Sequence, residues 1–262
     1  MPTSFVETGY TPLELPPEAL TRLNEDEATG LRFLANHPNF NILIHFSEHG
    51  KAEDLGDEDY FEVPLAKADL YAHENLGYER AENQYVLDIF SRRLIPRELL
   101  GQVLESGGDS FNDRKLTAIY DTGTYAVAAD VTSDHWLVNQ EPSIQHLGYM
   151  LEAIYTGGMP GTSESIAGAL INIVADRQKV REWIILSDLG NKIAELATVD
   201  PTIADKLQGG ILNVFMTYGS AHTGLFHKLR QLGLRPKRTF PTMPYEYSPV
   251  VSAIRKKIFE KI

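Results

Sequence analysis

Short apolar runs alternate along the chain with longer segments whose apolar residues follow helical spacing. The run FNILIHF at 40–46 lies between turn residues, a pattern typical of a buried strand. The run ILNVFMTY at 211–218 is the clearest strand pattern in the chain. In full, the strands predicted from the sequence are 40–46, 68–73, 125–130, 211–218 and 237–240.

Capping residues mark the boundaries of the predicted helices. Asn24 is followed three residues later by Glu27, which is a capping-box pattern, and Pro38 ends that helix. Asp200 followed by Pro201 predicts an N-cap with proline at the first helical position. The predicted helices run from Asn24 to Pro38, over 79–93, 96–106, 110–121, 162–175 and 178–197, from Asp200, over 222–232, and from Ser248.

Strands separated by helices predict an α/β fold, with a mainly parallel sheet, helices on both of its faces and a single domain. Residues 1–23 contain four prolines, and we expect them to form an extended N-terminal arm. The single α/β domain is then expected over 24–262. The acidic segment 51–62 lacks the ligand spacing of an EF-hand loop, and it predicts a solvated loop rather than a calcium site.

The composition excludes several classes of function. The 262 residues carry a formal net charge of −12, which argues against nucleic acid or an anionic membrane as the main partner. Cysteine is absent, and this excludes thiol catalysis, thiolate zinc sites and iron–sulfur clusters. The first residues lack the pattern of a signal peptide, and no stretch approaches the ~20 apolar residues of a spanning helix. We therefore expect a cytoplasmic protein whose main partner is neither a nucleic acid nor a membrane.

Polar residues follow four of the predicted strands, at the edge where open parallel sheets bind ligands. They are His49, Glu74, Asp130 and His222. Each has a simpler explanation, since His49 could lie in a surface loop and the other three could cap or begin helices. Their convergence on one edge from four separate segments nevertheless predicts a site. Arg181 could be a surface residue, or it could reach this edge and clamp an anion.

His222 has a further property that suits a site. It is predicted at the N-terminus of a helix, where the helix dipole disfavours a positively charged imidazolium. A neutral imidazole is the form that a metal ligand or a general base requires. Gly219 permits a tight turn out of the preceding strand, so we expect His222 to lie on the surface of a cleft.

Five segments carry a resemblance to a known family. Their order resembles that of the TraB-like superfamily, which includes Tiki-type peptidases, erythromycin esterases and ChaN-like haem-binding proteins, over roughly residues 40–240. The last segment, a strand followed by Gly-x-x-His and a helix ending in Leu-x-x-x-Gly, is the most specific. In the first segment, Phe46 and Ser47 stand where the family has Gly and often Glu. The segments are NILIHFSEHG at 41–50, ADLYAHENLG at 68–77, TYAVAAD at 124–130, REWIILSDLGNKIAEL at 181–196 and NVFMTYGSAHTGLFHKLRQLGL at 213–234.

The resemblance implies a hydrolase-like site. His49 and His222 would be its paired histidines, Glu74 the carboxylate between them, and Arg181 a clamp for the substrate or transition state. In the esterase-like members a histidine activates water without a metal. In the Tiki-like members the same motifs are linked to a divalent metal, for which His49, Glu74 and His222 would be the ligands. The resemblance therefore implies a hydrolase that acts on an ester or amide of a small-molecule or peptide substrate, with His49, Glu74, Arg181 and His222 as catalytic residues.

Two other functions remain open. One is a non-catalytic protein on the same scaffold that binds haem, a metal or another small molecule, and the altered first motif at Phe46 and Ser47 favours it. The other is an interaction protein whose histidines are incidental.

Overall fold

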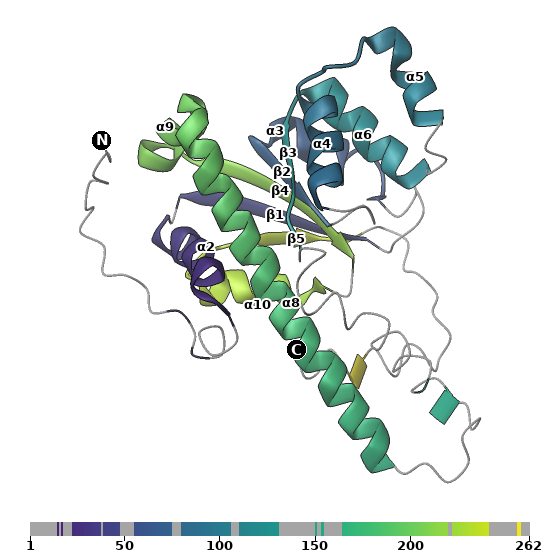
Figure 1. Ribbon diagram of the computed structural model, residues 1–262, viewed down its shortest axis with the longest axis vertical. Helices are drawn as coiled ribbons and strands as arrows, with labels where there is room; N and C mark the ends of the chain where they lie inside the picture. Colours follow the sequence, from purple (N-terminus) through teal and green to yellow (C-terminus); the bar gives the residue numbers. More distant parts are fainter. Residues whose placement is uncertain are drawn as a thin grey trace.

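The fold class predicted from the sequence is confirmed. The computed structural model contains a five-stranded sheet in which every strand pair is parallel, with strand order β3-β2-β4-β1-β5 (Figure 1). The strands are β1 (Phe40–Ser47), β2 (Leu70–His73), β3 (Tyr125–Ala128), β4 (Leu212–Gly219) and β5 (Lys237–Thr239). The structure describes residues 15, 17, 23–37, 39–47, 55–74, 80–105, 110–130, 150, 153–154, 164–219, 222–240 and 256–257.

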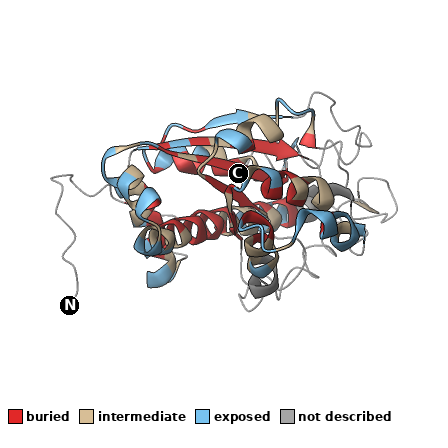
Figure 2. Ribbon diagram, turned by 90° about the horizontal axis from the view of Figure 1, so that it is seen from above, coloured by how far each residue is buried: buried red, intermediate tan, exposed pale blue. Residues whose placement is uncertain are grey.

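Helices cover both faces of this sheet. One face, here called the α8 face, packs against α2, α8 and α10, and the opposite α6 face packs against α3, α4 and α6. Figure 2 shows that buried residues are concentrated in the strands and along α8. The helices are α2 (Glu25–Asn36), α3 (Glu62–Lys67), α4 (Arg80–Ser91), α5 (Arg97–Glu105), α6 (Ser110–Thr122), α8 (Glu164–Val199), α9 (Pro201–Gly209) and α10 (Gly224–Gln231).

The apolar strand sequences supply both cores because alternate side chains point to opposite faces. Ile42, Ile44 and Phe46 of β1 belong to the core on the α8 face. Tyr71 of β2 and Phe215 of β4 belong to the core on the α6 face. Both faces of the sheet therefore pack against apolar cores, and the polar side chains at the strand ends differ from these surroundings.

The predicted capping signals are present at the helix starts. Asn24 and Glu27 form the reciprocal capping box, with the Asn24 side chain accepting from the Glu27 N–H at 2.8 Å. Asp200 accepts from the N–H of Thr202 at 2.8 Å at the start of α9.

One predicted helix boundary is wrong, and one helix was not predicted. The segments 162–175 and 178–197 form one continuous helix, α8, because the intervening residues include neither glycine nor proline to break it. Helix α3 was not predicted, and it begins at Glu62, at the end of the segment expected to be a loop.

Helix α8 is the structural support of the α8 face. It crosses α2 so closely that a Cβ atom on Gly190 would lie 2.1 Å from the backbone oxygen of Gly30. The hydroxyl of Ser187 donates to the backbone oxygen of Glu27 beside this crossing. Glycine is required at this crossing because of the close approach of the two backbones.

Within the described residues, no helix is both long and apolar enough to cross a membrane.

A side chain of α4 forms hydrogen bonds with the backbone of the edge strand β3. The amide of Gln84 donates to the backbone oxygen of Ala126 at 3.0 Å and accepts from the backbone N–H of Ala128 at 3.2 Å. Lys192 of α8 donates to the backbone oxygen of Ala128. Side chains thus fill hydrogen-bonding positions that another strand would otherwise take.

We expect Gln84→Leu to lower the free energy of unfolding by about 1–3 kcal/mol, since two hydrogen bonds to the edge strand are lost. Urea unfolding measures this change. The exposed Gln102 of α5 supplies the matched control, Gln102→Leu. Equal stability of the two variants would show that the amide of Gln84 does not support β3.

Candidate functional site

The carboxyl ends of β2 and β4 meet at a point where the chain topology changes direction. The connection leaving β2 passes through α4, α5 and α6 on the α6 face, whereas the connection leaving β4 passes through α10 on the α8 face. β2 and β4 are neighbours in the sheet. In open parallel sheets a crevice forms between neighbouring strands whose connections leave on opposite faces, and ligands bind there.

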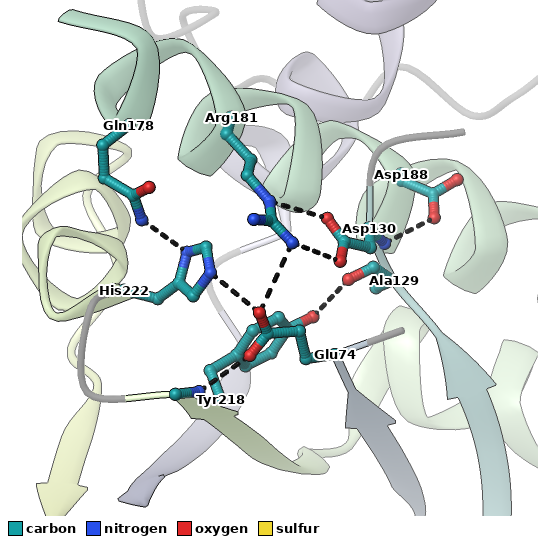
Figure 3. A network of polar contacts seen from close by, with 9 residues as sticks. Glu74, Ala129, Asp130, Gln178, Arg181, Asp188, Tyr218 and His222 are labelled. Atoms are coloured by element: carbon teal, nitrogen blue, oxygen red, sulfur yellow. Dashed lines mark hydrogen bonds and ion pairs between the residues drawn. The ribbon is translucent and has the colours of Figure 1, made fainter. Parts of the chain in front are cut away.

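Glu74 lies at the centre of the polar cluster at this point (Figure 3). It is the first residue after β2, and its Oε1 atom accepts from Nε2 of His222 at 3.0 Å and from Nη2 of Arg181 at 3.4 Å. Its Oε2 atom accepts from the backbone N–H of Gly219 at 2.8 Å. The carboxylate is thereby held at both oxygens by groups from β4, α8 and the turn before α10.

Arg181 connects Glu74 to a second carboxylate. Its Nε and Nη2 atoms donate to the two oxygens of Asp130 at 3.2 and 2.9 Å. This bidentate ion pair fixes the plane of the guanidinium group. The Asp130 side chain is 5% exposed and the Arg181 side chain 28% exposed. Among the described residues, the Arg181 guanidinium therefore pairs with two carboxylates, those of Asp130 and Glu74.

His222 is buried, and both of its ring nitrogens have partners. Gln178 of α8 places its amide nitrogen 2.8 Å from Nδ1, opposite the Glu74 contact at Nε2. If that amide nitrogen donates, Nδ1 carries a lone pair and Nε2 carries the proton donated to Glu74. The expected position on the surface of a cleft is wrong, because the imidazole is only 2% exposed.

Two further side chains brace the strand ends under the site. The hydroxyl of Tyr218 donates to the backbone oxygen of Ala129 at 2.6 Å, and Asp188 accepts from the backbone N–H of Asp130 at 3.3 Å. Burial raises the pKa of Tyr218 well above its usual range, and the charge of Asp130 raises that pKa further. Tyr218 therefore stays protonated and keeps its role as a donor.

The structure brings together three of the four residues predicted to be catalytic: Glu74, Arg181 and His222. His49 lies outside the described residues, so its predicted role stays a prediction. Asp130, which the sequence placed at the same edge, joins them as the partner of Arg181. Gln178 was missed, although it precedes Arg181 by three residues and so lies on the same side of α8.

The predicted metal site is not settled by this geometry. Glu74 and His222 supply an oxygen and an imidazole, which suit a divalent ion such as zinc. Among the described residues, no group of three or more His, Cys, Asp or Glu side chains could hold a metal ion. The third predicted ligand, His49, lies outside that part of the chain, and the set His49, Glu74 and His222 stays a prediction.

Comparison with known proteins does not assign the chain to a family. No protein-family model, no curated protein and no solved structure matches it. Membership of the TraB-like superfamily therefore stays an expectation from the sequence motifs.

Proposed function

We propose that the protein is a hydrolase of an ester or amide, with Glu74, His222 and Arg181 as its catalytic residues. The observation that supports this most is the sharing of one Glu74 oxygen between Nε2 of His222 and Nη2 of Arg181. A carboxylate bonded to one imidazole nitrogen orients the ring and leaves the other nitrogen to act as the base. The adjacent guanidinium can stabilise the negative charge that develops on a carbonyl oxygen.

In this proposal Nδ1 of His222 is the general base. The amide of Gln178 holds that nitrogen in the present arrangement, so water would take the place of the amide when substrate binds. Nδ1 then removes a proton from the water while its oxygen attacks the carbonyl carbon, and Glu74 stabilises the resulting imidazolium. The tetrahedral intermediate then collapses: its C–O or C–N bond to the leaving group breaks, the imidazolium gives its proton to that leaving oxygen or nitrogen, and the acid product departs as its carboxylate after losing a proton to solvent.

A non-catalytic binding protein is the second candidate. His222 is buried, and both of its ring nitrogens are already hydrogen-bonded, which favours this second candidate. The residues Phe46 and Ser47 in the first motif favour it too. In that case the same side chains hold a ligand, and no bond is broken.

The deciding experiment is a hydrolysis assay on protein purified without a histidine tag, with a panel of aryl esters and aryl amides. We expect Glu74→Gln to lower kcat/KM by about tenfold to a hundredfold, because an amide cannot both orient the imidazole and accept from the Gly219 N–H. Glu98→Gln, at an exposed position of α5, is the matched control. The assay is repeated after treatment with a chelator and again after zinc is added. Loss of activity with the chelator and its return with zinc would indicate metal-assisted hydrolysis, and unchanged activity would indicate metal-free hydrolysis.

Two results would count against the proposal. If Glu74→Gln hydrolyses as fast as Glu98→Gln, any activity arises elsewhere. If the wild type hydrolyses no substrate of either class, the binding protein takes the place of the hydrolase.

A further inference from the structure

A cavity of about 250 Å³ lies on the α6 face of the sheet, toward the amino ends of β1 and β4. Side chains of both strands form its floor, and they are register partners: Asn41 with Asn213, and Leu43 with Phe215. These side chains point to the α6 face, because Phe215 belongs to the core there and alternate residues of a strand share a face. Helix α3 forms one wall of the cavity.

The cavity is separate from the cluster around Glu74. The backbone N–H of Glu74 donates to the backbone oxygen of Thr217 at 3.2 Å, which places Glu74 beside the carboxyl end of β4. Asn213 lies four residues before Thr217, which is about 13 Å along a strand. Glu74 also pairs with Arg181 of α8, the helix that packs on the opposite face of the sheet. A ligand in the cavity would therefore not touch the proposed catalytic residues.

Two exposed charges of opposite sign line this cavity at its two ends. Lys67 is the last residue of α3, and the backbone N–H two residues later donates to the backbone oxygen of Asn213 at 2.9 Å, so Lys67 lies at the amino end. Asp59 lies at the other end, since the ring of its neighbour Tyr60 is 6.0 Å from the ring of His45. Within the described part of the chain, neither charge has an ion-pair partner. A ligand with two opposite charges could therefore pair with both.

The amide groups of the cavity floor are held in one orientation. Asp69 accepts from Lys206, and it also accepts from the backbone N–H and from Nδ2 of Asn213, at 2.9 and 3.1 Å. Since a carboxylate only accepts, Asn213 must turn Nδ2 toward Asp69 and Oδ1 toward Asn41. Asn41 donates to that oxygen from Nδ2 at 2.8 Å and keeps its second amide hydrogen. Together with Lys67, this amide makes the amino end of the cavity a donor site that suits a carboxylate.

The middle of the cavity is apolar and small. Leu43 and Phe215 line it from the sheet, and Val63 and Pro64 line it from α3. Its volume is below the usual range for pockets that hold drug-sized ligands. At roughly 30 Å³ for each water molecule in the liquid, it has room for about eight waters. A ligand of about that many non-hydrogen atoms, with an apolar part, fits this space.

We propose that this cavity binds a small zwitterion, an α-amino acid with an apolar side chain of the size of valine or leucine. The Lys67 ammonium and the Asn41 amide hold its carboxylate, and the Asp59 carboxylate holds its ammonium group. Its side chain packs against Leu43 and Val63. Charge complementarity supports this ligand, because each of its charges meets a charge that the described chain leaves unpaired. The proposal does not depend on the proposed hydrolase.

The test measures binding of L-leucine and of L-valine to the wild-type protein by isothermal titration calorimetry. We expect at least one of them to bind. Leucinamide lacks the carboxylate and N-acetylleucine lacks the ammonium group, so we expect each to bind about tenfold or more weakly than leucine. The proposal is overturned if the wild type binds neither amino acid, or if either analogue binds as tightly as leucine.

Two variants assign the binding to this cavity. Lys67→Gln and Asp59→Asn each remove one charge at an exposed position, so we expect an unchanged Tm. Each should raise the Kd for the bound amino acid by about tenfold to a hundredfold. Arg235→Gln and Glu58→Gln remove the same kinds of charge at exposed positions outside the cavity, and they should keep the wild-type Kd. A Kd in Lys67→Gln or in Asp59→Asn no higher than in its control would also overturn the proposal.

Discussion

Lys228→Met is expected to lower the free energy of unfolding by about 3–5 kcal/mol, as the loss of one partner from a buried ion pair usually does. Lys228 of α10 donates to Oε2 of Glu182 of α8 at 2.7 Å, and the two residues are 4% and 0% exposed. Removing the ammonium leaves a carboxylate buried without its counter-charge. The carboxylate has little room to move, because a Cβ atom on Gly224 would lie 2.1 Å from the same oxygen.

A second variant separates the pair from its surroundings. In Lys228→Met combined with Glu182→Met both charges are gone, and apolar side chains of similar size fill the space. We expect the double variant to recover most of the lost stability, since an apolar replacement of a whole buried pair is often neutral. Urea unfolding of the single variant, the double variant and Lys237→Met, an exposed control on β5, measures all three. A loss in Lys228→Met no larger than in Lys237→Met would contradict the prediction.

The sheet was predictable because its signals are local. An apolar run such as 40–46 is too short for a helix and is bounded by turn residues, so its type follows from a few neighbouring positions. Helix α3 gave no such signal, since Glu62–Lys67 is short and contains Pro64. The boundary placed within α8 failed for a different reason. Polarity changes at 176–179, but a change in polarity does not break a helix that other contacts hold.

The part of the site that could be predicted is the set of residues that directly follow strands. Glu74, Asp130 and His222 follow three neighbouring strands, so a parallel sheet alone brings them to one edge. The partner of Arg181 could not be predicted, because Asp130 and Arg181 are 51 residues apart and meet only when α8 packs on the sheet. The same holds for Glu182 and Lys228, and for Gln178 and His222.

His222→Gln is expected to lower kcat/KM for hydrolysis by about 10²–10⁴-fold, the usual cost of losing a general base. Alanine is the poorer choice here. His222 is 2% exposed and bonded at both nitrogens, so truncation would leave a cavity and two polar groups without partners. Glutamine can donate from its amide to Glu74 in place of Nε2, but it offers no basic nitrogen. We therefore expect the free energy of unfolding of this variant to lie within about 1 kcal/mol of the wild-type value.

The control for this variant is His227→Gln, five residues along the chain on the exposed side of α10. It also replaces a histidine by glutamine, so it corrects for any general effect of losing a histidine from this region. Rates and urea unfolding are measured on both variants together. A full rate in His222→Gln would remove this residue from the mechanism, whatever the result for Glu74→Gln. A rate loss with unchanged stability, confined to position 222, would separate proton transfer at His222 from its contribution to the fold.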